Sequence, residues 1–279
     1  MLEGDEERED DGEAGDDGEK PAEGEPGEEG GEKQGEGEPA KRRRSDADPD
    51  EPLLHAQTPV PSLDELRSAL AWAFESEAEA VPELLDRFAA HARLVLTGNQ
   101  VMNLTAVVEP REVAAKHYLD CWRATRLIPL TGRTLVDLGS GAGYPGIPVA
   151  LAERQSRMTL VDSMQKRAEF LKRCVAELAL PNVAVSSERG EDFLARNRCD
   201  IVFMRAISSV RENVRLLRKV KHSLKDLVLL KGPSWSREQR AAEREAERLG
   251  FRLDTVWEHE LPGELGQRAI LVYRAPGGH

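Results

Sequence analysis

The chain lacks the features that mark membrane, secreted and disulfide-bonded proteins. No window approaches about 18 consecutive apolar residues, so we expect no membrane-spanning helix. The opening residues, MLEGDEERED, contain neither the basic stretch nor the apolar core of a secretory signal. The three cysteines are odd in number and include no CxxC pair, which disfavours a disulfide framework and a zinc site. We therefore expect ordinary thiols, no metal ligands and a cytoplasmic protein.

Residues 1–50 also lack large apolar side chains. They hold 21 Asp and Glu against 7 Lys and Arg, together with ten glycines. Such a stretch cannot bury enough surface to offset the entropy of ordering, so we predict a disordered acidic tail over residues 1–55. The cluster Lys41–Arg44 could touch nucleic acid, although a solvated patch among acids is the commoner case. The rest of the chain, with 32 basic and 30 acidic residues, is close to neutral.

Residues 56–130 are predicted to form a helical N-terminal region without strands. Ser62 followed by Glu65 forms a capping box at the start of a first helix. A second helix opens at Pro82, and its apolar residues recur at spacings of three and four. A third helical segment is expected over residues 109–127.

Residues 131–279 alternate short β-rich runs with helical stretches. The first five runs predict a parallel sheet covered by helices on both faces. Only LPGELGQR separates the last two, which is too short for a helical crossover and predicts an antiparallel hairpin. The seven expected strands are Thr134–Leu138, Met158–Val161, Val183–Ser186, Asp200–Met204, Leu227–Leu230, Phe251–Glu258 and Ala269–Tyr273.

A glycine-rich loop follows the first expected strand. It has the pattern Asp-x-Gly-x-Gly-x-Gly from Asp137 to Gly143, and includes Gly139 and Gly141. Loops of this kind bind nucleotides at the carboxyl ends of parallel strands, although some glycine turns are purely structural. Tyr144 stands where a dinucleotide-binding loop has its third glycine. An acid this close would repel a pyrophosphate, so the loop favours a cationic cofactor such as S-adenosylmethionine.

Acidic residues follow the next two expected strands. Asp162 ends the second, 23 residues after Gly139, where a carboxylate can accept both ribose hydroxyls of a nucleoside. A helix cap is the alternative role for Asp162. The stretch Glu188–Phe193 follows the third strand, where it is expected to be a loop bordering the adenine or a solvated turn.

Several motifs then carry a resemblance to one family. They are NLT at 103–105, HYLDC at 117–121, VDLGSGAGYPGIPVAL, TLVDSMQKRAEFL at 159–171, RGEDF at 189–193, MRAISS at 204–209 and LLKG at 229–232. With these motifs in this order, the chain resembles a family of bacterial methyltransferases that modify guanine N7 in small-subunit ribosomal RNA. The family is also called glucose-inhibited division protein B. The resemblance covers about residues 62–275. It implies a class I S-adenosylmethionine-dependent methyltransferase fold, with a Rossmann-like seven-stranded sheet and a helical cap.

The resemblance also implies the reaction and the cofactor contacts. A methyl group would pass from S-adenosylmethionine to N7 of the guanine at position 527 of 16S rRNA, so the partner would be that RNA or the small subunit. Asp162 would bind the ribose. The other expected cofactor contacts are Gly139 and Gly141 of the glycine loop, Tyr144, Gly190, Glu191 and Arg205. Tyr144 departs from the family, which often has Leu or Phe there. GNQVM at 98–102 keeps the family's Asn but not its aromatic residue.

The residues after the fourth strand agree with N7 chemistry. Residues 204–208 contain no Asp/Asn-Pro-Pro-aromatic turn of the kind that amino-group methyltransferases use. Cys199 begins the fourth strand, at the wrong end for a catalytic thiolate. Guanine N7 has a free lone pair, so positioning can suffice and we expect no general base. Arg205 could bind the cofactor carboxylate or the substrate, or pair with Asp137 or Glu191.

Further polar residues are candidates for substrate contact. Lys166, Arg167 and Lys231 could hold RNA phosphates, although lysines on helix surfaces are usually solvated. Asn103 and His117 are expected to shape the substrate site. The alternative function is methylation of another RNA, a protein or a small molecule, because the ordered region lacks strong basic charge. We expect a monomer that has no membrane partner.

Overall fold

The computed structural model describes residues 53–277. The predicted tail therefore lies outside the described residues except at its end. There, residues 53–55, which we expected to belong to the tail, are described, and residues 54–57 form a turn. The Leu54 N–H donates to Asn103 Oδ1 over 3.1 Å.

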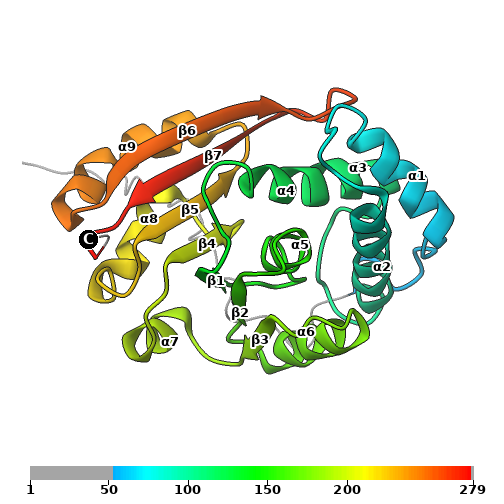
Figure 1. The fold of residues 1–279 in the computed structure, drawn as a ribbon, viewed down its shortest axis with the longest axis horizontal. Coiled ribbons are helices and arrows are strands. Elements are labelled where there is room, and N and C mark those ends of the chain that lie inside the picture. Colours follow the sequence, from blue (N-terminus) through cyan, green and yellow to red (C-terminus); the bar gives the residue numbers. More distant parts are fainter. Residues whose placement is uncertain (1–52, 278–279) are drawn as a thin grey trace, which may run out of the picture. The chain divides into compact units, whose positions relative to one another are not determined.

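Three helical stretches form the N-terminal cap (Figure 1). The first, α1 (Leu63–Ala73), begins with the predicted capping box, in which Ser62 and Glu65 each accept from the other's backbone N–H. The second, α2 (Pro82–Gly98), has Pro82 at its first turn. The third combines α3 (Pro110–Val113), a π-helical segment η1 (Ala114–Leu119) and α4 (Asp120–Ala124). The π-helical segment is not evident from the sequence pattern.

The seven predicted strands are present and form one sheet, in the order β3-β2-β1-β4-β5-β7-β6. The first five pair in parallel, while β7 is antiparallel to both β5 and β6. Their bounds are β1 Thr134–Leu138, β2 Arg157–Val161, β3 Val183–Ser186, β4 Ile201–Arg205, β5 Asp226–Lys231, β6 Arg252–Glu260 and β7 Gln267–Arg274. The predicted class I methyltransferase fold is confirmed.

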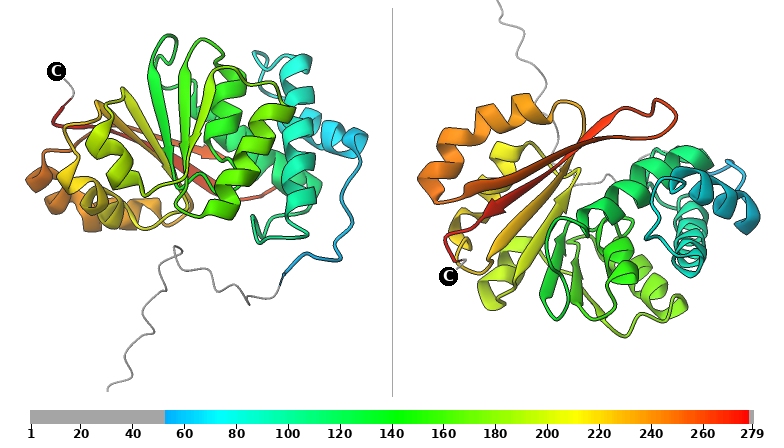
Figure 2. Two further views of the ribbon diagram at one scale, coloured as in Figure 1. Left: turned by 90° about the horizontal axis from the view of Figure 1, so that it is seen from below. Right: turned by 45° about the horizontal axis from the view of Figure 1, so that its top comes forward.

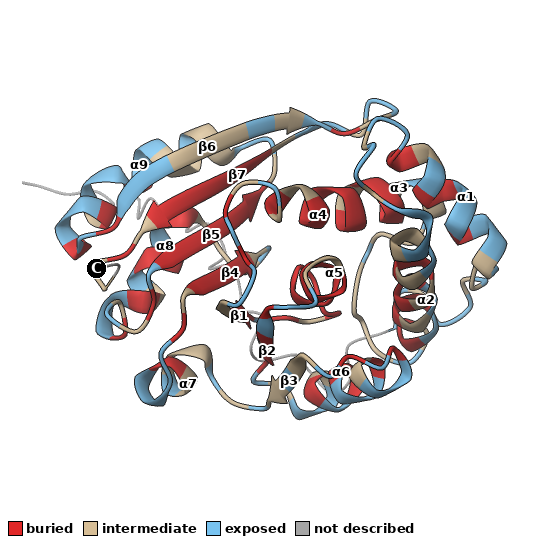
Figure 3. Cartoon of the chain, viewed as in Figure 1, coloured by how far each residue is buried: buried red, intermediate tan, exposed pale blue. Residues whose placement is uncertain are grey.

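Helices cover both faces of the sheet because residues along each strand alternate between two hydrophobic cores. Along β4, Ile201 and Phe203 pack into the core beneath the cap, while Val202 and Met204 face the other core. The cap, α5 (Gly146–Ala152) and α6 (Gln165–Glu177) cover the first core. The second lies beneath α7 (Gly190–Arg196), α8 (Val210–Leu216), a short 3-10 turn (Leu217–Lys219) and α9 (Trp235–Leu249). Figure 3 shows the central strands buried between these layers.

The β6–β7 hairpin reaches back to the cap (Figure 2). A Cβ on Gly263 at its tip would lie 2.8 Å from the Trp72 ring of α1, so only glycine fits there. The Arg123 guanidinium of α4 donates to the Glu260 carbonyl over 2.9 Å. The last hairpin thus holds the cap against the sheet.

The carboxyl ends of β1, β2, β4 and β5 lie along one edge of the sheet, where the candidate residues gather. Residues 190–193, which we expected to be a loop, instead open α7. The helix can start this close to β1 because Gly190 has no side chain: a Cβ there would lie 2.9 Å from Leu138. No helix within residues 53–277 is long and apolar enough to span a membrane.

Candidate cofactor and substrate site

The glycine loop needs its glycines for conformational reasons. Gly139, Gly141 and Gly143 have φ values of 68°, 57° and 95°, which side chains on L-residues rarely tolerate. A Cβ on Gly139 would also lie 2.9 Å from Ile207, beyond the end of β4. The loop is therefore a tight cradle at the end of β1, as predicted.

Asp162 holds this cradle from the end of β2. Its Oδ2 accepts from the Gly141 N–H and its Oδ1 accepts from the Met164 N–H, each over 2.9 Å. The side chain is almost fully buried. A carboxylate has about four lone-pair sites, so these bonds leave it able to accept ribose hydroxyls. The helix α6 begins at its N-cap Met164 without a side-chain cap hydrogen bond, so Asp162 does not cap this helix, and its ribose role stays a prediction.

Asp137 lies fully buried beneath the loop. Its Oδ2 accepts from the Gly146 N–H over 3.0 Å, but within the described chain its Oδ1 has no hydrogen-bond partner. Burial raises the pKa of this carboxyl to about 7, against the opposing effect of the Gly146 hydrogen bond. An orphaned carboxylate oxygen under a glycine cradle fits a cationic ligand and would disfavour a phosphate.

Arg205 extends from the end of β4 to the cap. One terminal nitrogen, Nη2, donates to the Lys116 carbonyl over 2.7 Å and to His117 Nδ1 over 2.6 Å, and Nη1 lies 3.2 Å from Cys121 Sγ. Neither Asp137 nor Glu191 forms an ion pair with it, and no other described carboxylate does so. Its charge is thus held by neutral groups.

His117 links Arg205 to the NLT loop. An arginine can only donate, so His117 Nδ1 accepts and Nε2 carries the proton that is donated to Thr105 Oγ1 over 3.0 Å. Burial and the nearby Arg205 charge hold the pKa of His117 well below its ordinary value. Asn99 in turn fixes the loop, since its Oδ1 accepts from the Leu104 and Thr105 amides.

These contacts define the surroundings of two residues that we expected to shape the substrate site. His117 uses both ring nitrogens inside the protein, where one of them contacts Arg205. Asn103, at the start of the same loop, accepts from the Leu54 N–H. Asp120, three residues beyond His117, points elsewhere, with its Oδ1 3.2 Å from His259 Nε2 of β6.

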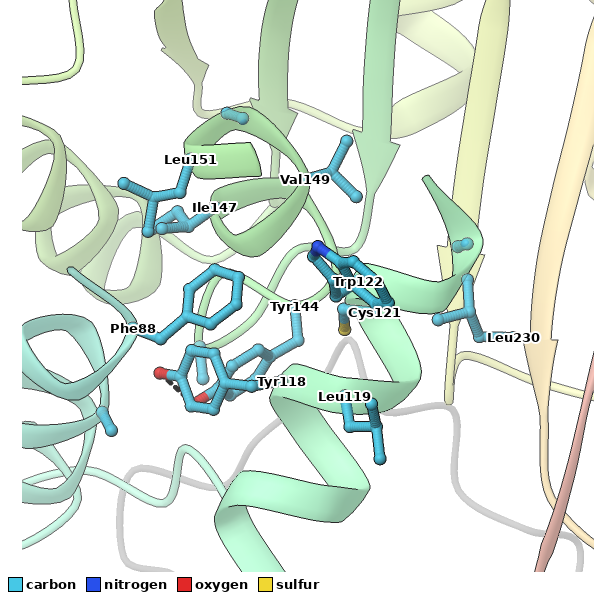
Figure 4. Close-up of a cluster of buried hydrophobic side chains, with 14 of the residues drawn as sticks. Phe88, Tyr118, Leu119, Cys121, Trp122, Tyr144, Ile147, Val149, Leu151 and Leu230 are labelled. Atoms are coloured by element: carbon cyan, nitrogen blue, oxygen red, sulfur yellow. Dashed lines mark hydrogen bonds between the residues drawn. The ribbon is translucent and has the colours of Figure 1, made fainter. Parts of the chain in front are cut away.

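Tyr144, which the resemblance implies as a cofactor contact, is largely buried. Its ring stacks on His117 with centroids 4.4 Å apart, and the Arg205 guanidinium carbon lies 5.7 Å from the ring centroid. Its hydroxyl donates to the Tyr118 hydroxyl over 3.0 Å (Figure 4). Tyr144 therefore belongs to the packing beneath the site.

The remaining candidates fall into two groups. Gly190 and Glu191 begin α7 at the same sheet edge. Lys166, which is exposed, and Arg167, which is partly buried, lie in the first turn of α6, four and five residues after Asp162. Lys231, in contrast, is 7% exposed and donates to the Ser208 carbonyl over 2.6 Å and to Glu238 Oε2 over 2.8 Å. We therefore do not retain Lys231 as a phosphate contact.

Sequence analysis missed His91, Tyr118 and Cys121. His91 is a lone polar residue on the apolar face of α2, next to Phe88 and Ala92, and that placement is the feature that could have identified it. Tyr118 and Cys121 lie inside the HYLDC motif but gave no sign of their partners. In residues 53–277 no group of three or more His, Cys, Asp or Glu side chains could hold a metal ion.

Comparison with known proteins agrees with this geometry. Residues 84–264 match the family described as rRNA small subunit methyltransferase G. The chain is 37% identical over 197 residues to the ribosomal RNA small subunit methyltransferase G of Carboxydothermus hydrogenoformans, covering 69% of this chain and 83% of that protein. The protein of the same name from Solibacter usitatus is 40% identical over 67% of this chain and 88% of its own length. That from Nitrosomonas europaea is 33% identical over 72% and 95%, respectively. The chain therefore belongs to the rRNA small subunit methyltransferase G family.

Proposed function

We propose that this protein transfers a methyl group from S-adenosylmethionine to N7 of the guanine at position 527 of 16S rRNA. The observation that carries the proposal is the cradle formed by Gly139–Gly143, held by Asp162 and underlain by the orphaned oxygen of Asp137. Family membership supports small-subunit rRNA as the substrate, since the curated relatives bear that name.

The cofactor fits the charges of the cradle. S-adenosylmethionine supplies a methyl group on a positively charged sulfur. Asp137 offers it a buried acidic oxygen, and Asp162 can accept the ribose hydroxyls while holding the loop through the Gly141 N–H. The glycines allow close approach of the backbone to the ligand. Gly190 and Glu191, at the start of α7, are the residues we assign to the adenine side.

The groups beyond β4 support attack by a nucleophile that has no proton to lose. His117 is neutral and both of its ring nitrogens are engaged. Burial raises the pKa of the Cys121 thiol to about 12, so it is neither a base nor a nucleophile at neutral pH. Guanine N7 requires only alignment with the methyl carbon and sulfur, which this arrangement can supply.

Arg205 is the cation best placed to orient the reactants. Its hydrogen-bond partners are a carbonyl, a neutral imidazole and a thiol, and no carboxylate in residues 53–277 forms an ion pair with it. We assign it to the cofactor carboxylate or to the guanine and its phosphate. Lys166 and Arg167, together with Asn103, are the proposed contacts at the rim for RNA.

The experiment compares substrates directly. Wild-type protein and the Asp162→Ala variant are each incubated with labelled S-adenosylmethionine and one of four substrate pools. The pools are under-methylated small subunits, free 16S rRNA, total protein and metabolites. We expect label in 16S rRNA, located by mass spectrometry as N7-methylguanosine, and none with Asp162→Ala. Label in another pool would support the alternative, a class I methyltransferase with a different substrate. Absence of cofactor binding by the wild type would refute the proposal altogether.

A further inference from the structure

A chain of hydrogen bonds runs beneath the glycine loop and links it to the cap. His91 Nε2 of α2 lies 3.2 Å from the Ala142 carbonyl, and His91 Nδ1 lies 2.9 Å from the Tyr118 hydroxyl of η1. The Tyr118 hydroxyl in turn accepts from the Tyr144 hydroxyl over 3.0 Å. Both ends of the chain, Ala142 and Tyr144, belong to the cofactor loop. All four residues are buried, none more than 8% exposed.

The direction of every bond in this chain is fixed. A carbonyl can only accept, so His91 Nε2 carries the proton. Burial lowers the pKa of His91 to about 3, so its Nδ1 is unprotonated at neutral pH and accepts from Tyr118. Tyr118 then has no second proton to give and accepts from Tyr144. No member can reverse its role without leaving a buried group unpaired.

The far end of the chain sets the position of an aromatic ring. The Tyr144 ring is stacked on His117 at 4.4 Å and lies beneath the Arg205 guanidinium at 5.7 Å. His117 is itself hydrogen-bonded to Arg205 over 2.6 Å. The three side chains therefore contact each other, and a shift of the Tyr144 ring moves the surface that supports both His117 and Arg205.

The loop is also shaped around His91. A Cβ on Gly143 would lie 3.2 Å from His91 Nε2 and 2.6 Å from Ile147 Cδ1, so the backbone approaches the imidazole as closely as glycine allows. Figure 4 shows the Tyr118 and Tyr144 hydroxyls directed at one another among apolar side chains. A buried polar group that loses its partner in such surroundings is costly.

We propose that Tyr144 is a positioning residue, which the chain through Tyr118 and His91 locks so that its ring holds Arg205 and the cofactor loop in their working arrangement. The inference rests on the proposed function, since it assigns the cradle to S-adenosylmethionine. It explains why a tyrosine, and not only an apolar residue, occupies this place: the hydroxyl ties the ring to the loop's own Ala142.

Substitution of the central hydroxyl tests the proposal. Tyr118→Phe removes the acceptor of Tyr144 and the donor to His91, which leaves two buried polar groups unpaired. The Tyr144 hydroxyl can then be satisfied only if its ring moves. We expect at least a tenfold weaker Kd for S-adenosylhomocysteine, measured by calorimetry, and a lower kcat/KM on under-methylated subunits.

The double variant Tyr118→Phe/Tyr144→Phe supplies the decisive comparison. It removes the stranded Tyr144 donor while keeping both rings, but it also removes the hydrogen bonds that lock the Tyr144 ring, so the Kd should stay at least about threefold weaker than that of the wild type. An effect due only to an unpaired buried hydroxyl predicts full recovery instead. The proposal is overturned if either the double variant or Tyr118→Phe binds as the wild type does.

Tyr273→Phe is the matched control. The Tyr273 hydroxyl is buried in the opposite core and has no hydrogen-bond partner in the described chain, so its loss should leave the Kd unchanged. The hydrogen-bond chain can also be tested in the wild-type protein. There, ¹⁵N NMR should show the His91 imidazole as the Nε2–H form from pH 8 to pH 5. An imidazole that titrates in that range overturns the proposal. A wild type that binds no cofactor instead contradicts the proposed function.

Discussion

Arg205 and Lys231 are cations at the carboxyl ends of neighbouring strands, yet their surroundings differ completely. Arg205 ends β4 and reaches the cap, where it donates hydrogen bonds to a carbonyl, a neutral imidazole and a thiol. Lys231 ends β5 and faces α9, where Glu238 pairs with it over 2.8 Å. Both are the last residue of their strand, so their backbones present them at the same edge of the sheet.

The difference shows that the covering layer decides what a cation at a strand end can do. The α9 side supplies a carboxylate and converts Lys231 into a tie between strand and helix. The cap supplies neutral hydrogen-bond partners, and Asp120 acts on Arg205 only through space, so the positive charge of Arg205 is not taken up by an ion pair. The comparison makes one residue a candidate for function and the other a structural residue.

Loss of Arg205 should produce the largest effect. We expect Arg205→Ala to lower kcat/KM for methylation of the small subunit by about a hundredfold, because charge-assisted hydrogen bonds to the reactants are lost. Lys231→Ala should change kcat/KM less than about threefold once the protein is folded. Initial rates with labelled cofactor measure both. Equal losses in the two variants would remove the distinction.

Loss of Lys231 should instead appear in stability. Lys231→Met leaves Glu238 and the Ser208 carbonyl without a cation, which should lower the free energy of unfolding by about 2 kcal/mol. The double variant Lys231→Met/Glu238→Gln removes the stranded charge but keeps hydrogen-bonding atoms, so part of the loss should return. Denaturant titration of the variants gives the values. An unchanged midpoint for Lys231→Met would show that the pair contributes nothing.

The sequence located the ends of the strands but not the partners of the residues there. Gly139, Asp162 and Arg205 follow directly from strand boundaries, because parallel strands share one carboxyl edge. The sequence pattern also identified the terminal hairpin, because the segment between the last two strands is too short for a helix. In contrast, Lys231 was indistinguishable from Arg205 until α9 was placed against it.

Two local features were also outside the reach of sequence pattern. The π-helical segment Ala114–Leu119 turns His117 toward Arg205 and Asp120 toward His259, although simple helical spacing puts them on one face. The start of α7 at Gly190 depends on contact with Leu138, more than fifty positions earlier. Both depend on tertiary packing, which local propensity does not encode.

The charge of Arg205 should also be detectable through Asp137. The folded-state pKa of Asp137 is about 7 against an ordinary 3.8, raised by burial and partly offset by the Gly146 hydrogen bond and the Arg205 charge. The folded protein thus holds this proton more tightly than the unfolded chain, and the group lowers stability as pH rises from 3.8 towards 7. A cationic cofactor favours the ionised form, so its affinity should fall by up to about tenfold from pH 8 to pH 6.

Variants identify the source of this pH dependence. Asp137→Asn should make the Kd for S-adenosylmethionine independent of pH between 6 and 8. Arg205→Met should move the midpoint upwards, since a cation that favours ionisation of Asp137 is lost, whereas Lys231→Met should leave it in place. Calorimetry in two buffers of different ionisation enthalpy measures the released proton. A wild-type Kd that does not change with pH would mean that ionisation of Asp137 is not coupled to cofactor binding.

The smallest effect should come from the weakest of the Arg205 contacts. The Cys121 sulfur lies 3.2 Å from Arg205 Nη1, but a thiol is a weak acceptor, and burial keeps it neutral with a pKa of about 12. Cys121→Ala leaves the Lys116 carbonyl and His117 in place, so kcat/KM should fall no more than about twofold, with a stability loss of about 1 kcal/mol for the lost packing. A loss as large as that of Arg205→Ala would require a thiolate at Cys121. Arg205 would then be ion-paired like Lys231, and its charge would no longer be free for a ligand.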